Sequence, residues 1–86
     1  MSILVIDVGT SGLRASVVRD TGVIEHLRYE AFAPQSPAPG LVEFDAQLMR
    51  DAVLRVSIAA LQAAGSVSAV GITNQRASTI MWDRAT

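Results

Sequence analysis

Residues 3–14 read ILVIDVGTSGLR. This stretch opens with an apolar, mostly β-branched run from Ile3 to Ile6, which is typical of a short strand covered on both faces. Asp7 ends this run, and the small residues from Gly9 to Gly12 favour a turn. Apolar and polar side chains then alternate from Leu13 to Val18, which predicts a second strand. The stretch therefore predicts two strands joined by a tight turn, with a carboxylate at the tip of the first strand.

The residues that follow predict a third strand and then an irregular connection. The segment from Asp20 to Gly22 favours a hairpin turn, with glycine where a positive φ is needed. Residues 23–32 alternate loosely between polar and apolar and predict the third strand. Prolines recur in residues 33–40 (APQSPAPG), and proline disfavours both helices and central strands. Because short turns join antiparallel neighbours, the first three strands should form a meander.

A helix is predicted from Ala46 to Ala64, where apolar residues recur at helical spacing. Asp45 stands at the expected N-cap and Gly65 at the expected C-cap. Apolar runs at residues 68–73 and 78–82 predict two more strands. The order β-β-β-α-β-β indicates an incomplete α/β unit, in which the helical crossover adds a parallel strand to an antiparallel sheet.

Length and composition exclude several classes of protein. The 86 residues suffice for one small domain, and 50% hydrophobic against 17% charged residues argues against disorder. We also expect some apolar faces to be left for other protein to cover. A net charge of −1 leaves no basic surplus for nucleic acid. With no cysteine the chain cannot build a Cys-ligated metal site, and with His26 as the one histidine it cannot build a metal site on a pair of histidines.

The first residues do not resemble a targeting segment. Met1-Ser2 leads directly into an apolar run that ends after four residues, which is neither a signal peptide nor a membrane span. We therefore expect a cytoplasmic protein with no membrane partner.

The turn after Asp7 suits the binding of phosphate. Small residues from Gly9 to Gly12 let backbone N–H groups point at an anion, and the hydroxyls of Thr10 and Ser11 can add hydrogen bonds. The Asp7 carboxylate can hold Mg²⁺ directly or through water, and Arg14 can reach the same phosphates. The sequence has neither the Walker A pattern nor the G-x-G-x-x-G dinucleotide motif. The alternative from the residues alone is a plain hairpin turn with a capping aspartate.

The chain carries three motifs in a fixed order: DVGTSGLR at residues 7–14, GLVEFD at residues 40–45 and GITNQR at residues 71–76, followed by TIMWDR at residues 79–84. Together they resemble the FGGY carbohydrate kinases, a family of the sugar-kinase, Hsp70 and actin superfamily, and the last motif is most similar to that of glycerol kinases. The resemblance implies a ribonuclease-H-like (actin-like ATPase) fold. Residues 1–86 would be the N-terminal part of the family's N-terminal domain, without the remainder of that domain and without the C-terminal domain.

The resemblance also implies a reaction, namely ATP-dependent phosphorylation of a polyol or sugar hydroxyl with Mg²⁺. By this resemblance Asp7 is the catalytic and metal-binding position, and Gln75 and Arg76 bind the substrate. The nucleotide positions are Gly9, Thr10, Ser11, Gly12 and Arg14. A second aspartate, which serves the family as the catalytic base toward the substrate hydroxyl, and the adenine-binding domain come later in family sequences, so we expect the 86 residues alone to be inactive.

One residue departs from the glycerol kinase pattern. Glycerol kinases have a glutamate directly after the arginine that Arg76 matches, and here the residue is Ala77. Alanine cannot accept a hydrogen bond from a substrate hydroxyl, and an unpaired buried hydroxyl costs on the order of 1–3 kcal/mol. The departure leaves the family resemblance intact and favours a polyol or sugar other than glycerol.

Other interpretations remain open from the residues. The chain can be a non-catalytic sugar- or nucleotide-binding module, or one that self-associates into a homo-oligomer through an open sheet edge. It can also belong to a phosphatase or a chaperone-type ATPase of the same superfamily, although GITNQR argues against this. Arg76 has a simpler interpretation as a solvated loop residue, Trp82 as a core residue and His26 as a solvent-facing strand residue.

Overall fold

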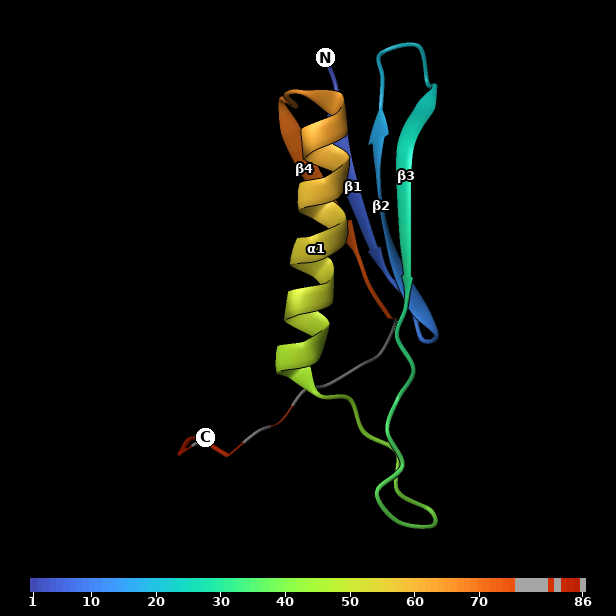
Figure 1. Ribbon diagram of the computed structural model, residues 1–86, viewed down its shortest axis with the longest axis vertical. Helices are drawn as coiled ribbons and strands as arrows, with labels where there is room; N and C mark the ends of the chain where they lie inside the picture. The colour runs from blue at the N-terminus through green and yellow to red at the C-terminus, as the bar shows by residue number, and fades with distance from the viewer. Residues whose placement is uncertain (76–80, 82, 86) are drawn as a thin grey trace.

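The computed structural model describes residues 1–75, 81 and 83–85 (Figure 1). Its elements, in chain order, are β1 (Ile3–Val8), β2 (Gly12–Val18), β3 (Ile24–Ala31), α1 (Ala46–Ala64) and β4 (Ala69–Thr73). The helix has the predicted bounds, and β1 extends through Asp7 to Val8, two residues beyond the apolar run that predicted it. The strand predicted at residues 78–82, with Trp82 in it, lies outside the described residues.

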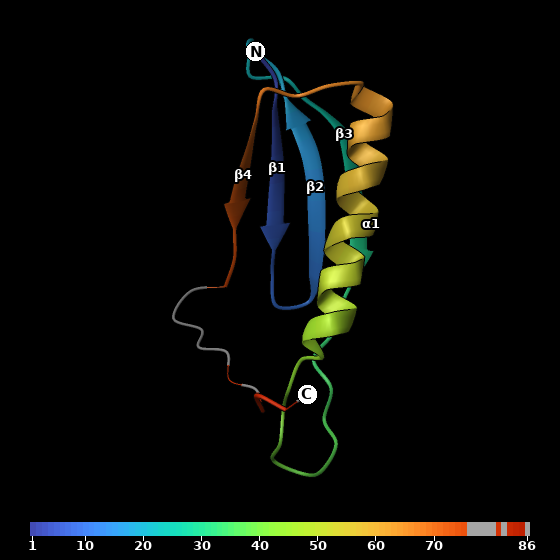
Figure 2. The same ribbon diagram turned by 90° about the vertical axis from the view of Figure 1, so that its left-hand side faces the viewer.

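The four strands form one mixed sheet in the order β3-β2-β1-β4. Strands β1 and β2 are antiparallel, as are β2 and β3, and β4 runs parallel to β1. The crossover through α1 is what makes β1 and β4 parallel, because the chain returns to the same end of the sheet before β4 begins (Figure 2). The sheet confirms the predicted α/β class, with an antiparallel meander extended by one parallel strand.

The core lies between α1 and one face of β1 and β2. Every second side chain of these strands faces the helix, which alternation in a strand requires. The buried apolar residues are Leu4, Ile6, Leu13, Ala15 and Val17 from the strands and Ala52, Val56 and Ala60 from the helix. Small helix residues allow α1 to lie close to the sheet.

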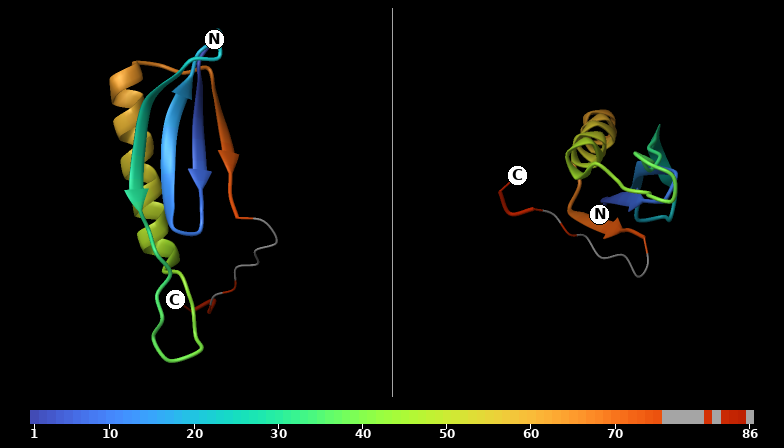
Figure 3. Two further views of the ribbon diagram at one scale, coloured as in Figure 1. Left: turned by 90° about the vertical axis from the view of Figure 1, so that its right-hand side faces the viewer. Right: turned by 90° about the horizontal axis from the view of Figure 1, so that it is seen from below.

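The helix covers only part of that face. It packs against β2 and β3 and less against β1. Strand β4 is the edge strand beyond β1, and the helix does not cover it (Figures 2 and 3). Val70 and Ile72 of β4 pair in register with Leu4 and Ile6, yet they are 55% and 70% exposed. The expectation of uncovered apolar faces is therefore confirmed. Within the described residues, no helix is long and apolar enough to cross a membrane.

Local capping signals account for the bounds of α1. The Asp45 carboxylate accepts a hydrogen bond from the Leu48 backbone N–H at 3.1 Å. At the other end Gly65 has a φ of 91° and donates its N–H to the Leu61 carbonyl at 2.9 Å. Gly22 has a φ of 85° in the turn between β2 and β3, as its place in the sequence predicted.

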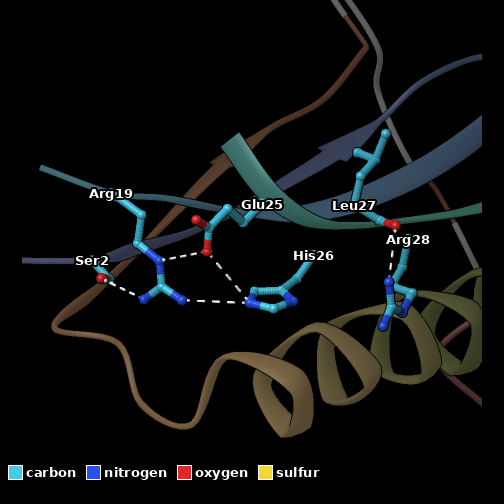
Figure 4. A network of polar contacts seen from close by, with 6 residues as sticks. All are labelled: Ser2, Arg19, Glu25, His26, Leu27 and Arg28. Atoms are coloured by element: carbon cyan, nitrogen blue, oxygen red, sulfur yellow. Dashed lines mark hydrogen bonds and ion pairs between the residues drawn. The ribbon is translucent and has the colours of Figure 1, made fainter. Parts of the chain in front are cut away.

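A bulge interrupts the pairing of β2 with β3. The register shifts between Ala15 and Val17, and His26 on the bulged strand has a φ of 55°. The His26 side chain is 29% exposed, with its Nε2 atom 3.6 Å from Glu25 Oε2 and 3.4 Å from a guanidinium nitrogen of Arg19 (Figure 4). The His26 ring is therefore half-buried in a polar cluster beside β2, where a simply solvent-facing side chain was expected.

Candidate functional site

The turn between β1 and β2 presents free backbone donors. It is closed by a hydrogen bond from the Gly9 N–H to the Gly12 carbonyl at 2.9 Å. Thr10 and Ser11 at its tip are exposed, and among the described residues their backbone N–H groups have no hydrogen-bond partner. Ser11 instead uses its carbonyl, which accepts from the Phe32 N–H at 3.0 Å. The tip of this turn therefore presents N–H groups and hydroxyls that can donate to an anion.

A row of side chains crosses the sheet next to this turn. Strand pairing places Tyr29, Arg14, Asp7 and Thr73 side by side, one residue from each strand in the order β3-β2-β1-β4. The row lies on the face opposite the helix, because the residues on either side of Asp7 and Arg14 in sequence point toward the core side. Asp7 and Arg14, which the sequence singled out, are therefore cross-strand neighbours on one open face.

Gln75 joins the turn from the other end of the chain. Its side-chain Nε2 donates to the Gly9 carbonyl at 3.2 Å, across 66 positions of sequence. Because β4 runs parallel to β1, both strands end at the same edge of the sheet, and the residues after β4 reach the turn after β1 (Figure 2). The structure thus brings the motif at residues 71–76 against the motif at residues 7–14. Arg76 and Ala77 lie outside the described residues.

Gly12 has a steric role that the sequence did not reveal. It is the first residue of β2 and is buried, and the Tyr29 ring lies directly over it. A Cβ on Gly12 would overlap with the hydroxyl and the outer ring carbons of Tyr29. The guanidinium carbon of Arg14 lies 5.6 Å from the centre of the same ring. Tyr29 is therefore a site neighbour that sequence reasoning missed.

Thr73 was missed for the same reason as Tyr29. Both residues join the row only through strand register, and the bulge at His26 shifts the register of β3 relative to a simple count along the chain. Alternation along each strand gives the face of a residue, but it does not give its partner on the next strand.

The donor set at Asp7 suits Mg²⁺ better than a metal held wholly by protein. No group of three or more His, Asp or Glu side chains gathers anywhere in the described part of the chain. Mg²⁺ commonly binds through one or two carboxylates together with water and phosphate oxygens. A single carboxylate beside the Thr73 hydroxyl and a phosphate-binding turn fits that pattern.

The fold and the row define a class of protein. A solved structure of a xyloylose kinase from Brucella ovis superposes with a TM-score of 0.74 over 87% of this chain and 17% of that chain, at 26% sequence identity. The mixed sheet with its helix has the ribonuclease-H-like fold of the actin-like class, as expected from the sequence.

Sequence comparison narrows the class to a family. The model of the N-terminal domain of the FGGY family of carbohydrate kinases matches residues 2–86. Glycerol kinases from Trichlorobacter lovleyi and Xanthobacter autotrophicus are 41% and 42% identical to the chain over 88 aligned positions, which include 98% of it. The chain belongs to the FGGY family of carbohydrate kinases. It spans about 18% of the length of these relatives.

Proposed function

We propose that the protein to which this chain belongs transfers a phosphoryl group from ATP to a hydroxyl of a polyol or sugar. Family membership supports a carbohydrate kinase, and the relatives are glycerol kinases. The observation that carries the proposal is the open row of Asp7 and Arg14 beside a turn with unpaired N–H groups, which Gln75 contacts from the second motif.

Each residue has a role that its chemistry supports. The N–H groups and hydroxyls of Thr10 and Ser11 bind phosphate oxygens, and Arg14 adds a cation on the nucleotide side. Asp7 holds Mg²⁺, and the ion when bound neutralises charge on the phosphates. Gly9 and Gly12 keep the turn small, while Gln75 and Arg76 are assigned to substrate binding. Phosphoryl transfer depends mostly on positioning and electrostatic stabilisation, and this chain supplies one wall of such a site.

The substrate is proposed to be a polyol or sugar other than glycerol, because Ala77 offers no acceptor to a substrate hydroxyl. The 86 residues alone are proposed to be inactive, since the aspartate that is the family's catalytic base and the adenine-binding domain come later in family sequences. We place the complete enzyme in the cytoplasm.

The test compares two aspartate variants of the complete kinase. Asp7→Ala should lower kcat at least about 100-fold, as losses of electrostatic stabilisation at a transferring group do. Asp20→Ala is the matched control, because it removes the same charge in the turn at the opposite end of β2, where Asp20 pairs with the chain's amino group. Equal activity of the Asp7 variant and the control would refute the assignment. Arg76→Ala should raise the KM of the polyol or sugar much more than that of ATP.

A second function has one observation in its favour. Val70 and Ile72 leave an apolar strip on β4, which together with β3 forms the two edges of the sheet in the described residues. An exposed apolar edge can pair with a second copy of the chain. Light scattering coupled to size exclusion tests this second function. A self-associating module elutes as a dimer or larger, and a clean monomer counts against self-association.

A further inference from the structure

We propose that Tyr29 is a positioning residue for nucleotide binding, which holds the Arg14 guanidinium on the β3 side of the row and away from Asp7. This inference rests on the proposed function for the role of Arg14. It goes beyond that function, because Tyr29 belongs to none of the three motifs and lies on the strand between them.

The contact is built by three strand positions. Arg14 and Tyr29 are cross-strand partners, and the guanidinium carbon lies 5.6 Å from the ring centre, within the range of a cation–π contact. The ring leans toward the start of β2 and occupies the space above Gly12, where any side chain would collide with it. The Tyr29 ring therefore contacts both Gly12, which has no side chain, and the Arg14 guanidinium, and these two contacts define its position.

The ring lies on the side of Arg14 away from Asp7, and this bears on how the two opposite charges interact. Asp7 and Arg14 are direct neighbours in register on the same face, where opposite charges usually attract. Yet among the described residues Arg14 forms no ion pair, and its guanidinium lies over the Tyr29 ring instead. Arg14 held on the ring leaves the Asp7 carboxylate available to a cation and keeps the guanidinium for a phosphate.

If the ring holds Arg14 in position before the nucleotide binds, the affinity for the nucleotide should be higher than without the ring. A long exposed side chain loses rotamer freedom when it binds a ligand, and prior positioning reduces that loss. The ring contributes only this positioning, so the rate of phosphoryl transfer at saturating ATP should not depend on it.

The experiment uses the complete kinase and measures KM for ATP, kcat, and Kd for MgATP by calorimetry. Tyr29→Leu should raise KM and Kd about two- to five-fold, the value of an exposed cation–π contact, with kcat and the KM of the carbohydrate unchanged. Tyr29→Phe keeps the aromatic ring and should have the wild-type KM for ATP and Kd for MgATP. Ile24→Ala is the control, because Ile24 is a similarly exposed apolar residue at the far end of β3 (64% against 55% for Tyr29).

The decisive measurement is the dependence on Arg14. In an Arg14→Ala background, Tyr29→Leu should have no further effect on the Kd of MgATP. An equal effect in both backgrounds, an effect shared by Tyr29→Phe, or an unchanged Kd in Tyr29→Leu would overturn the inference. An active Asp7→Ala variant would instead refute the proposed function, and the role of Tyr29 would still be decided by these affinities.

Discussion

Gly12→Ala tests whether glycine at this position serves the packing of Tyr29. The new Cβ would overlap with the outer edge of the ring, and since Tyr29 is 55% exposed the ring can swing outward into solvent. A fully buried tyrosine removes about 150–250 Å² from water, and a half-buried ring that gives up about 40 Å² of contact on swinging outward loses about 1 kcal/mol at about 25 cal/mol per Å². Loss of the Arg14 contact adds about 0.5–1 kcal/mol.

Alanine also has a favourable effect that partly offsets this cost. Replacing glycine within a strand reduces the entropy lost on folding by roughly 0.5–1 kcal/mol. We therefore expect Gly12→Ala to destabilise the chain by about 1 kcal/mol when Tyr29 is present, which is roughly 4–8 °C in Tm for a domain of this size. In a Tyr29→Ala background the same change should stabilise by about 0.5 kcal/mol, because nothing collides with the new methyl group.

The assay is a double-mutant cycle on the 86-residue chain. Urea unfolding followed by circular dichroism at the helix signal gives the free energy of unfolding of the wild type, both single variants and the double variant. The coupling between the two sites should be about 1.5 kcal/mol, within the range for residues in direct contact. A coupling near zero would show that Gly12 does not make room for Tyr29 and would refute this role of the glycine.

Three further predictions concern α1 and its contacts. Ser57 is buried, and among the described residues its hydroxyl has no hydrogen-bond partner. Ser57→Ala should therefore raise the free energy of unfolding, measured in urea titrations, by about 1 kcal/mol. A lower free energy of unfolding in this variant would contradict the prediction. Asp45→Ala should lower that free energy by about 1 kcal/mol, because it removes the N-cap acceptor for Leu48, while Asp45→Asn should retain most of the stability. Hydrogen bonds from Arg55 hold the pKa of Glu30 below its ordinary value of 4.5. The stabilisation from this pair is therefore present above pH 4.5 and lost as the pH falls through the lowered pKa, and Arg55→Gln should return the Glu30 pKa, measured by NMR, toward 4.5.

The site could be predicted in part. The sequence pattern and the family resemblance singled out Asp7, Arg14 and the turn between them, and the structure places these on one open face. The contact of Gln75 with Gly9 follows once β4 is known to run parallel to β1, which the helical crossover predicts. Tyr29 could not be found this way, because its partner depends on a bulge that no residue pattern announces.

The sequence by itself determined the elements, because their signals are local. The bounds of α1 follow from helical spacing between an aspartate cap and a glycine cap, and the strands follow from alternation and turn residues. The tertiary structure alone decided which side chains share the open face, that the helix leaves β4 uncovered, and that a tyrosine lies over Gly12. The physical reason is that register is set by hydrogen bonds between distant strands, where one bulged residue changes every partner beyond it.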